Sequence, residues 1–405
     1  MRTPAQALRL ILSHVARAAP LPAERVPLAQ ALGRALAESL VAGQDLPPFA
    51  ASTMDGYALR AADADAPGAA LPVAFEVAAG HPSTRRLPRG ACCRIFTGGA
   101  LPAGADAVEM QEQVERRAGV AAFQRPAVAG RFVRPRGDAV RRGRVALPAG
   151  AVIDPGAIGL AASLGQASLQ VRRRPRVLLI PTGDEVVGLG ARRRSGQIFE
   201  SNSHVLAAAV AEAGGVAEIQ PAAGDDLASL QRVLRRARRA DVVVTTGGVS
   251  VGDRDLVKEA LAGAGGALHL WRVAMRPGKP LAFGQLGRRL FFGLPGNPVS
   301  ALVTFELFVR PALRRLAGLS GAGRLLVRGR LTHAQELAPG LTVYLRARVV
   351  REGPTLALTP LRSQASGNLT SATGLDALAI LPPGPGRIEA GAEVEAVLLH
   401  PPAGD

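Results

Sequence analysis

Cysteine is almost absent from this chain. Only Cys92 and Cys93 occur among 405 residues, and two adjacent thiols cannot supply a disulfide framework or a structural zinc site. They lie in the run ACCRIF, which is typical of a strand, so we expect buried, unreactive thiols. Such sparse cysteine use also fits a reducing compartment, and we expect a cytoplasmic protein.

Long apolar runs and aromatic residues are scarce as well. No stretch approaches the roughly 18 apolar residues that would cross a bilayer. The first residues, MRTPAQ, lead into an amphipathic helix rather than a signal peptide, so we expect no membrane partner. Aromatic residues make up 3% of the chain, which leaves few stacking platforms for single-stranded nucleic acid.

Lysine is nearly replaced by arginine. The net charge is +17 and Lys plus Arg number 49, yet only Lys258 and Lys279 are lysines. A charge of this sign suggests polyanionic partners. Arginine, alanine and glycine dominate throughout the chain, however, as in a coding bias, and we do not expect nucleic acid as the primary partner. The rarity of lysine gives weight to Lys279 as a compact ammonium donor.

The remaining patterns predict several modules. Residues 3–19 predict a helix, and residues 71–148 hold short β-like runs separated by Gly, Pro and Arg turns. Strands and helices alternate from residue 173 to about residue 320, which predicts a three-layer α/β/α domain with a mostly parallel sheet. Residues 321–405 predict a small β module.

The segment 242–255, VVVTTGGVSVGDRD, carries the clearest ligand signal. A buried strand ends at a glycine pair, where backbone can approach a ligand closely, and the carboxyl ends of parallel strands are where such sheets bind ligands. Asp253 and Asp255 could offer oxygen ligands to Mg²⁺. A strand followed by an ordinary turn, with Asp255 as a helix cap, fits equally well.

Two further segments end predicted strands at the same sheet edge. PTGDE, residues 181–185, brings Glu185 towards Asp253 and Asp255, where the three could hold one cation. In FGLPGNPVS, residues 292–300, Asn297 can cap a helix whose start would suit phosphate. Arg276 and Lys279, just upstream, favour the anion site over a plain helix start.

Other catalytic patterns are missing. The six histidines are scattered and no pair has metal-ligand spacing. No nucleophile elbow or Walker phosphate loop occurs.

Together these motifs resemble the molybdopterin molybdenumtransferases, the MoeA family, which includes the corresponding domain of gephyrin. The similar stretches run through the whole chain in the family's order: PPFAASTMDGYA (47–58), RIFTGG (94–99), GADAVEMQE (104–112), TGDE (182–185), TGGVSVG (246–252), RPGKP (276–280) and GLPGNPVS (293–300).

The resemblance implies a multidomain α/β plus β fold. A discontinuous, elongated linker domain would hold residues 1–26 and 140–172, and a β-rich second domain residues 27–139. The α/β molybdopterin-binding domain would hold residues 173–320, and a C-terminal β-barrel-like domain residues 321–405. A homodimer is also implied, with a cleft between the α/β domain of one subunit and the second domain of the other.

The resemblance also implies a reaction, in which molybdenum from molybdate enters adenylyl-molybdopterin and AMP leaves, with Mg²⁺ as cofactor. Contacts with a Mog-type adenylyltransferase and with acceptor molybdoenzymes would follow.

The family's site residues transfer to this chain by motif. Catalytic roles would fall to Asp55, Thr97, Glu185, Asp225 and Asp255, the last three also serving the metal. Substrate-binding roles would fall to Gly247, Gly248, Ser250, Arg272, Arg276, Lys279, Asn297, Ser300, Arg346 and Ser366.

Three positions depart from the family pattern. Ala139 stands where a carboxylate is usual, after Asp138. Arg276 replaces a lysine, which keeps the charge but changes the donor geometry. Ala50 replaces a polar residue near Asp55.

Two other functions remain open. A Mog-type adenylyltransferase shares the α/β domain but needs neither flanking module. A non-catalytic scaffold or nucleic-acid-binding homologue is supported only by the charge.

Overall fold

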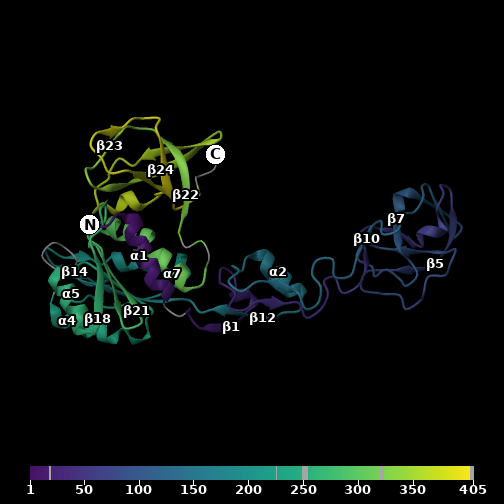
Figure 1. Cartoon of the computed structure of the whole chain (residues 1–405), viewed down its shortest axis with the longest axis horizontal. Helices are drawn as coiled ribbons and strands as arrows, with labels where there is room; N and C mark the ends of the chain where they lie inside the picture. Colours follow the sequence, from purple (N-terminus) through teal and green to yellow (C-terminus); the bar gives the residue numbers. More distant parts are fainter. Residues whose placement is uncertain (18–19, 225, 249–253, 320, 322, 402–405) are drawn as a thin grey trace.

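A computed structural model describes residues 1–17, 20–224, 226–248, 254–319, 321 and 323–401. These residues form an elongated molecule (Figure 1). The α/β domain and the terminal β module lie against each other at one end, a separate β module lies at the other, and a slender arm joins the two ends. No helix in the described ranges is long and apolar enough to cross a membrane.

The separate β module is built on one sheet in the order β7-β4-β6-β5-β9-β8. Its strands are β4 (Gly56–Leu59), β5 (Ala70–Val77), β6 (Cys92–Ile95), β7 (Ala107–Met110), β8 (Val114–Arg117) and β9 (Val120–Phe123). β4 lies before residues 71–148, for which the sequence predicts short strands. Its first residue, Gly56, has to be glycine, because a Cβ there would lie 1.9 Å from the Glu109 carbonyl oxygen.

Cys92 and Cys93 lie fully buried in β6. Burial raises the pKa of each thiol to about 12, so neither forms appreciable thiolate near neutral pH. The expectation of buried, unreactive thiols is confirmed.

The arm is an antiparallel ribbon with a short helix beside it. β1 (Ala23–Pro27) pairs with β12 (Ser168–Arg172), and β2 (Leu40–Val41) pairs with β11 (Val145–Leu147). Helix α2 (Pro155–Ser163) begins where the Asp154 carboxylate accepts a hydrogen bond from the Ala157 amide. Single bridges continue the pairing as far as Leu46 and Val140, beyond the boundary at residue 26 that we expected.

The α/β domain carries a six-stranded, mostly parallel sheet, as predicted. Its order is β16-β13-β17-β21-β20-β18, and only the last two strands run antiparallel to their neighbours. The strands are β13 (Arg176–Pro181), β16 (Val216–Ile219), β17 (Val242–Thr246), β18 (Gly266–Trp271), β20 (Ala282–Leu286) and β21 (Arg289–Leu294). Its helices are α3 (Asn202–Glu212), α4 (Leu227–Arg236), α5 (Arg254–Gly263), α6 (Pro298–Thr304) and α7 (Arg310–Leu316).

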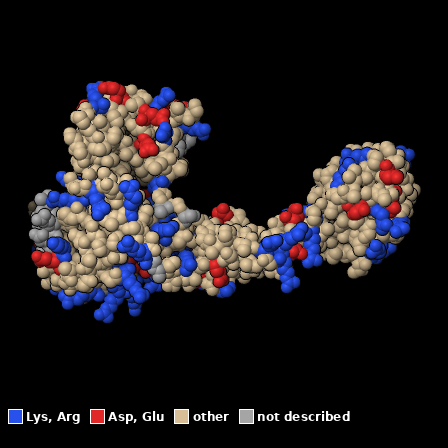
Figure 2. All heavy atoms as spheres, in the orientation of Figure 1, with Lys and Arg blue, Asp and Glu red and all other residues tan. Residues whose placement is uncertain are grey.

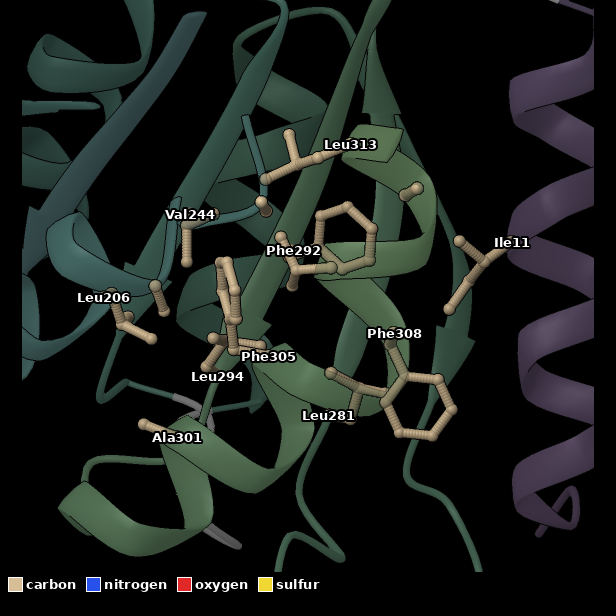
Figure 3. Packing of buried hydrophobic residues seen from close by; sticks show 14 of the residues in the cluster. Ile11, Leu206, Val244, Leu281, Phe292, Leu294, Ala301, Phe305, Phe308 and Leu313 are labelled. Carbon is tan, nitrogen blue, oxygen red and sulfur yellow. The ribbon is translucent and has the colours of Figure 1, made fainter. Parts of the chain in front are cut away.

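The main core lies on one face of this sheet (Figure 3). Phe292 of β21 and Val244 of β17 are fully buried there, with Phe305 and Phe308 from the π-helical turn Phe305–Val309. The N-terminal helix α1 (Pro4–Arg17) adds Ile11 to the same cluster. The first helix of the chain is therefore anchored on the α/β domain before the chain enters the arm.

The terminal module is a small closed barrel. Strands follow in the order β24-β25-β22-β28-β26, and a further pairing of β24 with β26 closes the ring. These strands are β22 (Leu325–Leu331), β24 (Thr342–Glu352), β25 (Thr355–Pro360), β26 (Ala377–Leu381) and β28 (Glu393–Leu398). The predicted β-barrel-like module is confirmed.

A buried ion cluster fixes the barrel to the α/β domain. The Glu306 carboxylate, on a residue only 4% exposed, accepts hydrogen bonds from Nε of Arg310 at 2.7 Å and of Arg324 at 2.8 Å. Arg324 also donates to the Leu399 carbonyl at the end of the barrel and pairs with Glu212 of α3 at 2.8 Å. Arg324 thus connects both bodies through one guanidinium.

We predict that Glu306→Gln lowers stability sharply. It would leave Arg310, itself 4% exposed, with a buried charge and a weaker partner, and breaking such a pair costs about 3–5 kcal/mol. Urea unfolding measures the change. Glu389→Gln is the matched control, because Glu389 pairs with Arg387 on the surface; an equal loss in both variants would contradict the assignment.

Candidate active site

Three loops leave the α/β sheet at one edge because three parallel strands are in register. Pro181 of β13 lies opposite Thr246 of β17, and Thr246 lies opposite Leu294 of β21. The segments that follow are those singled out in the sequence. Their predicted convergence at the carboxyl edge of the sheet is thus present in the structure.

A cavity of about 560 Å³ lies between these loops. The first loop contributes Thr182, Gly183 and Glu185, and the second contributes Gly247 and Gly248. The rest of the wall comes from Pro181, Val186, Ile198, Phe199, Glu200, Ser201, Asn202, Thr246, Pro280, Pro295, Gly296, Asn297, Pro298 and Gly367. Gly367 belongs to the terminal module, so the cavity lies at the junction of two bodies.

The glycine pair has a conformation that other residues avoid. Gly247 has φ +93° and Gly248 has φ +66°. A Cβ on Gly247 would lie 2.7 Å from Oγ1 of Thr182, whose hydroxyl donates to the Thr246 carbonyl. Glycine therefore lets the first two loops approach each other.

The carboxylates expected at a metal are only partly described. Glu185 is exposed and lines the cavity. Asp225, Ser250 and Asp253 lie outside the described residues, as does the side chain of Asp255, although its backbone opens α5. Among the described residues no three metal-ligating side chains cluster.

Asp226 takes the capping role at this edge. Its carboxylate accepts from the Ser229 amide at 2.8 Å at the start of α4. This hydrogen bonding from Ser229 lowers the pKa of Asp226. Capping thus explains the second aspartate of the Asp225-Asp226 pair.

The expectation that Asn297 caps α6 is wrong. Its side chain makes no cap bond and instead donates from Nδ2 to the Ser366 hydroxyl at 2.9 Å. The Ser366 carbonyl accepts from the Val299 amide at 3.2 Å. A loop of the barrel therefore supplies a hydrogen-bond acceptor to an amide in the first turn of α6. Ser300, in the same turn, is buried and does not line the cavity.

Arg346 lies under that loop with no exposed surface. Its Nη2 donates to the carbonyls of Ser363 and Ala365 at 3.1 and 3.3 Å. Nε and Nη1 have no hydrogen-bond partner in the described part of the chain, and burial lowers the pKa of the guanidinium. The side chain holds the Ser366 loop and retains an uncompensated positive charge.

The three other basic residues border the site without lining it. Arg272 follows β18 with a positive φ of 67°, and Lys279 is exposed on the same turn. Arg276 lies in β19 (Met275–Arg276), which pairs with β24 of the barrel. Only Pro280 of this segment contributes to the cavity wall.

Asp55 and Thr97 come together, but far from the cavity. The Asp55 carboxylate accepts from the amide and the hydroxyl of Thr97 at 2.7 and 2.8 Å. These hydrogen bonds lower the pKa of Asp55, so it stays ionised to lower pH than an ordinary aspartate. The pair lies in the β module at the opposite end of the molecule (Figure 1).

Two of the three family departures, Ala139 and Ala50, also lie on the β module and arm. Ala139 donates its amide to the Leu46 carbonyl. Asp138 pairs with Arg134 at 3.1 Å on the surface, so its carboxylate is already engaged. The Ala50 carbonyl accepts from the Leu101 amide.

Sequence reasoning missed one wall of the cavity. Glu200 and Asn202 line it, as do Ile198 and Phe199 of β15 (Ile198–Phe199). Ser201 precedes helix α3 but makes no side-chain cap bond, and the Glu200 carboxylate accepts from the Ser203 amide instead. The sequence signal for this wall was an acidic residue, Glu200, and an amide side chain, Asn202, next to a helix start.

Three family models match successive parts of the chain. Residues 2–165 match the MoeA N-terminal region (domain I and II), residues 178–315 a probable molybdopterin binding domain, and residues 328–399 the MoeA C-terminal region (domain IV).

Curated relatives match over most of their length. The molybdopterin molybdenumtransferase 2 of Mycobacterium tuberculosis is 39% identical, covering 86% of this chain and 89% of the relative. A molybdopterin molybdenumtransferase of Staphylococcus aureus is 31% identical, covering 100% and 98%. The crystal structure of a molybdopterin biosynthesis MoeA protein from Pyrococcus horikoshii superposes with a TM-score of 0.83 at 33% identity and covers 98% of each chain.

The fold and the cavity define the class of protein. It is a multidomain protein with an α/β domain of the molybdopterin-binding type, and a cleft lies at the carboxyl edge of the parallel strands of that domain. Within that class, the chain belongs to the MoeA family, whose curated members matched here are named molybdopterin molybdenumtransferases.

We predict that Gly247→Ala damages the site more than the fold. A side chain at this φ is strained by about 1–3 kcal/mol. Its Cβ would also lie only 2.7 Å from Oγ1 of Thr182 and would push that side chain away. We expect a modest fall in unfolding free energy and a loss of affinity for AMP, measured by calorimetry. Gly214→Ala is the control, because Gly214 has φ +87° but open space around it; equal AMP affinity in both variants would contradict the role.

Proposed function

We propose that this protein inserts molybdenum from molybdate into adenylyl-molybdopterin, with release of AMP. The observation that carries the proposal is the cavity at the junction of the α/β domain and the barrel. Its walls include the Glu185 carboxylate, the glycine pair and Asn297, whose side chain bonds Ser366 of the barrel. The full-length similarity to proteins named molybdopterin molybdenumtransferase supports the same reaction.

The phosphate groups of the substrate belong on the side of the cavity formed by the glycine pair and the turn 295–298. Gly247 and Gly248 leave backbone accessible there, and Thr182 and Asn297 add polar side chains to the wall. Arg272, Arg276 and Lys279 lie on the segment that leads to Pro280 of the wall and would add positive charge to this region. Ser250 would lie on the same loop as the glycine pair.

Mg²⁺ is the proposed cofactor. Mg²⁺ binds through one or two carboxylates together with substrate phosphates and water. Glu185 on the cavity wall fits that requirement, and Asp225 and Asp255 would add the remaining carboxylates. When bound, the ion would neutralise charge on the phosphoanhydride.

Molybdate belongs beside the barrel loop. The buried Arg346 guanidinium has two nitrogens without partners, and an uncompensated buried cation favours a nearby anion. Ser366, whose hydroxyl accepts a hydrogen bond from Asn297, comes just before Gly367 of the cavity wall. Binding there would place the oxyanion near the rest of the substrate, and such proximity lowers the entropic part of the barrier.

A homodimer is proposed to complete the site. Asp55 and Thr97 lie at the opposite end of the chain from the cavity (Figure 1), so one subunit cannot bring the two together in this arrangement. The arm carries exposed apolar residues that suit a partner surface: Val41 and Val145 lie opposite each other on the ribbon and are 50% and 54% exposed. Leu32 is 54% exposed on the same arm.

The proposed chemistry also sets the neighbours in the pathway. A Mog-type adenylyltransferase would supply the substrate, and acceptor molybdoenzymes would take the product. The two free, buried cysteines fit the cytoplasm, where thiols stay reduced.

The reaction is tested by incubating purified protein with adenylyl-molybdopterin and Mg²⁺, with and without molybdate. We expect AMP release that depends on molybdate. Consumption of ATP and molybdopterin to make the adenylylated intermediate would instead identify a Mog-type adenylyltransferase. Tight DNA binding with a steep salt dependence and no AMP release would identify a nucleic-acid-binding homologue.

Mixing two inactive variants tests the shared site. Glu185→Gln and Asp55→Asn should each abolish molybdenum insertion while leaving the fold intact, measured by AMP release and circular dichroism. If the site uses one residue from each subunit, random reassociation leaves one intact site in each mixed dimer and restores about a quarter of full activity. No recovery after verified subunit exchange, or normal turnover by Glu185→Gln, would contradict the arrangement.

A further inference from the structure

Glu200 and Asn202 both line the cavity, and each has a buried acceptor oxygen with no partner among the described residues. Glu200 is 7% exposed, and its Oε1 accepts from the Ser203 amide at 2.8 Å. Its Oε2 has no hydrogen-bond partner among the described residues, and Nε2 of His204 lies 3.8 Å from it. A buried carboxylate oxygen left unsatisfied is costly.

Asn202 presents the second acceptor, and its orientation is fixed by chemistry. Its side chain meets the Gly296 carbonyl oxygen at 2.8 Å. A carbonyl oxygen can only accept, so the group facing it must be the amide NH₂. Oδ1 therefore points elsewhere, and it has no partner in the part of the chain that the structure describes.

Two unpartnered acceptors require a ligand that donates. Phosphate and molybdate present acceptor oxygens and negative charge, so the Glu200 carboxylate would repel them. Ile198 and Phe199 line the same cavity with apolar side chains that are 53% and 44% exposed, which suits the face of a flat ring. The wall thus fits a planar heterocycle with N–H groups at its edge.

We propose that Glu200 and Asn202 recognise the aminopyrimidinone edge of the pterin, where the 2-amino group and N3–H donate to the two free oxygens. This proposal rests on the proposed function, because that function brings a pterin into the cavity. It also orients the substrate: the donor edge faces Glu200, and the phosphate end faces the glycine pair and Asn297 on other parts of the wall.

The test uses pterin binding to the whole protein, without molybdate or adenylylated substrate. The probe is a fluorescent phosphomethyl pterin, compared with the same compound lacking the 2-amino group, each titrated by fluorescence. Loss of one hydrogen bond to the charged Glu200 carboxylate should weaken binding, so we expect the amino compound to bind about 10- to 100-fold more tightly than the compound without the amino group. Glu200→Gln, which keeps the acceptor to Ser203, should remove most of that preference.

Two further variants separate recognition from folding. Asn202→Ala removes the other acceptor and should reduce the preference by a smaller factor. Ser203→Ala is the matched control, because its hydroxyl lies buried in the same turn, has no partner and does not line the cavity. We expect Ser203→Ala to bind both probes as the unaltered protein does.

An unchanged preference in Glu200→Gln and Asn202→Ala would overturn the proposal. A shift in Mg²⁺ half-saturation of AMP release with unchanged pterin preference would also overturn it, because Glu200 would then be a metal ligand. Failure of the proposed function is distinguishable: a protein that releases no AMP but still prefers the amino pterin through Glu200 retains this site with another reaction.

Discussion

Pro181, Thr246 and Leu294 stand opposite one another on three neighbouring parallel strands, and that register places the three loops that follow these strands at the cavity. A parallel pair sends both chains out at the same edge of the sheet. The loop that carries Glu185, the glycine pair and the Pro295–Pro298 turn therefore all begin at the same edge of the sheet. Their close contact depends on Gly247, where any side chain would collide with Thr182.

The second constraint is the attachment of the barrel. Glu306, Arg310 and Arg324 form buried ion pairs at the junction, and the loop around Ser366 reaches across to Asn297 and Val299. Both contacts fix the barrel on the helices that follow β21. Figure 2 shows basic residues along the lower edge of the α/β domain and also close to the barrel, so the positive charge is spread over the visible face of this domain.

The long arm separates chemistry that the motifs suggest belongs together. Asp55 and Thr97 form a tight local pair, yet the antiparallel ribbon holds their module away from the α/β domain (Figure 1). An extended two-stranded ribbon cannot fold back while its pairings persist. The proposal of a site shared between two subunits agrees with this shape and with the exposed apolar residues of the arm.

By itself the sequence determined features that depend on near neighbours. Apolar runs identified β13, β17 and β21, and the glycine pair and the capping aspartate before α4 could be read from local patterns. Only the tertiary structure decided which distant group each side chain meets. Asn297 bonds Ser366 instead of capping its helix, Glu200 replaces Ser201 as the cap of α3, and Arg346 is buried beneath a loop. The reason is physical: a polar side chain bonds to whichever segment packs against it, and that segment lies far away in the chain.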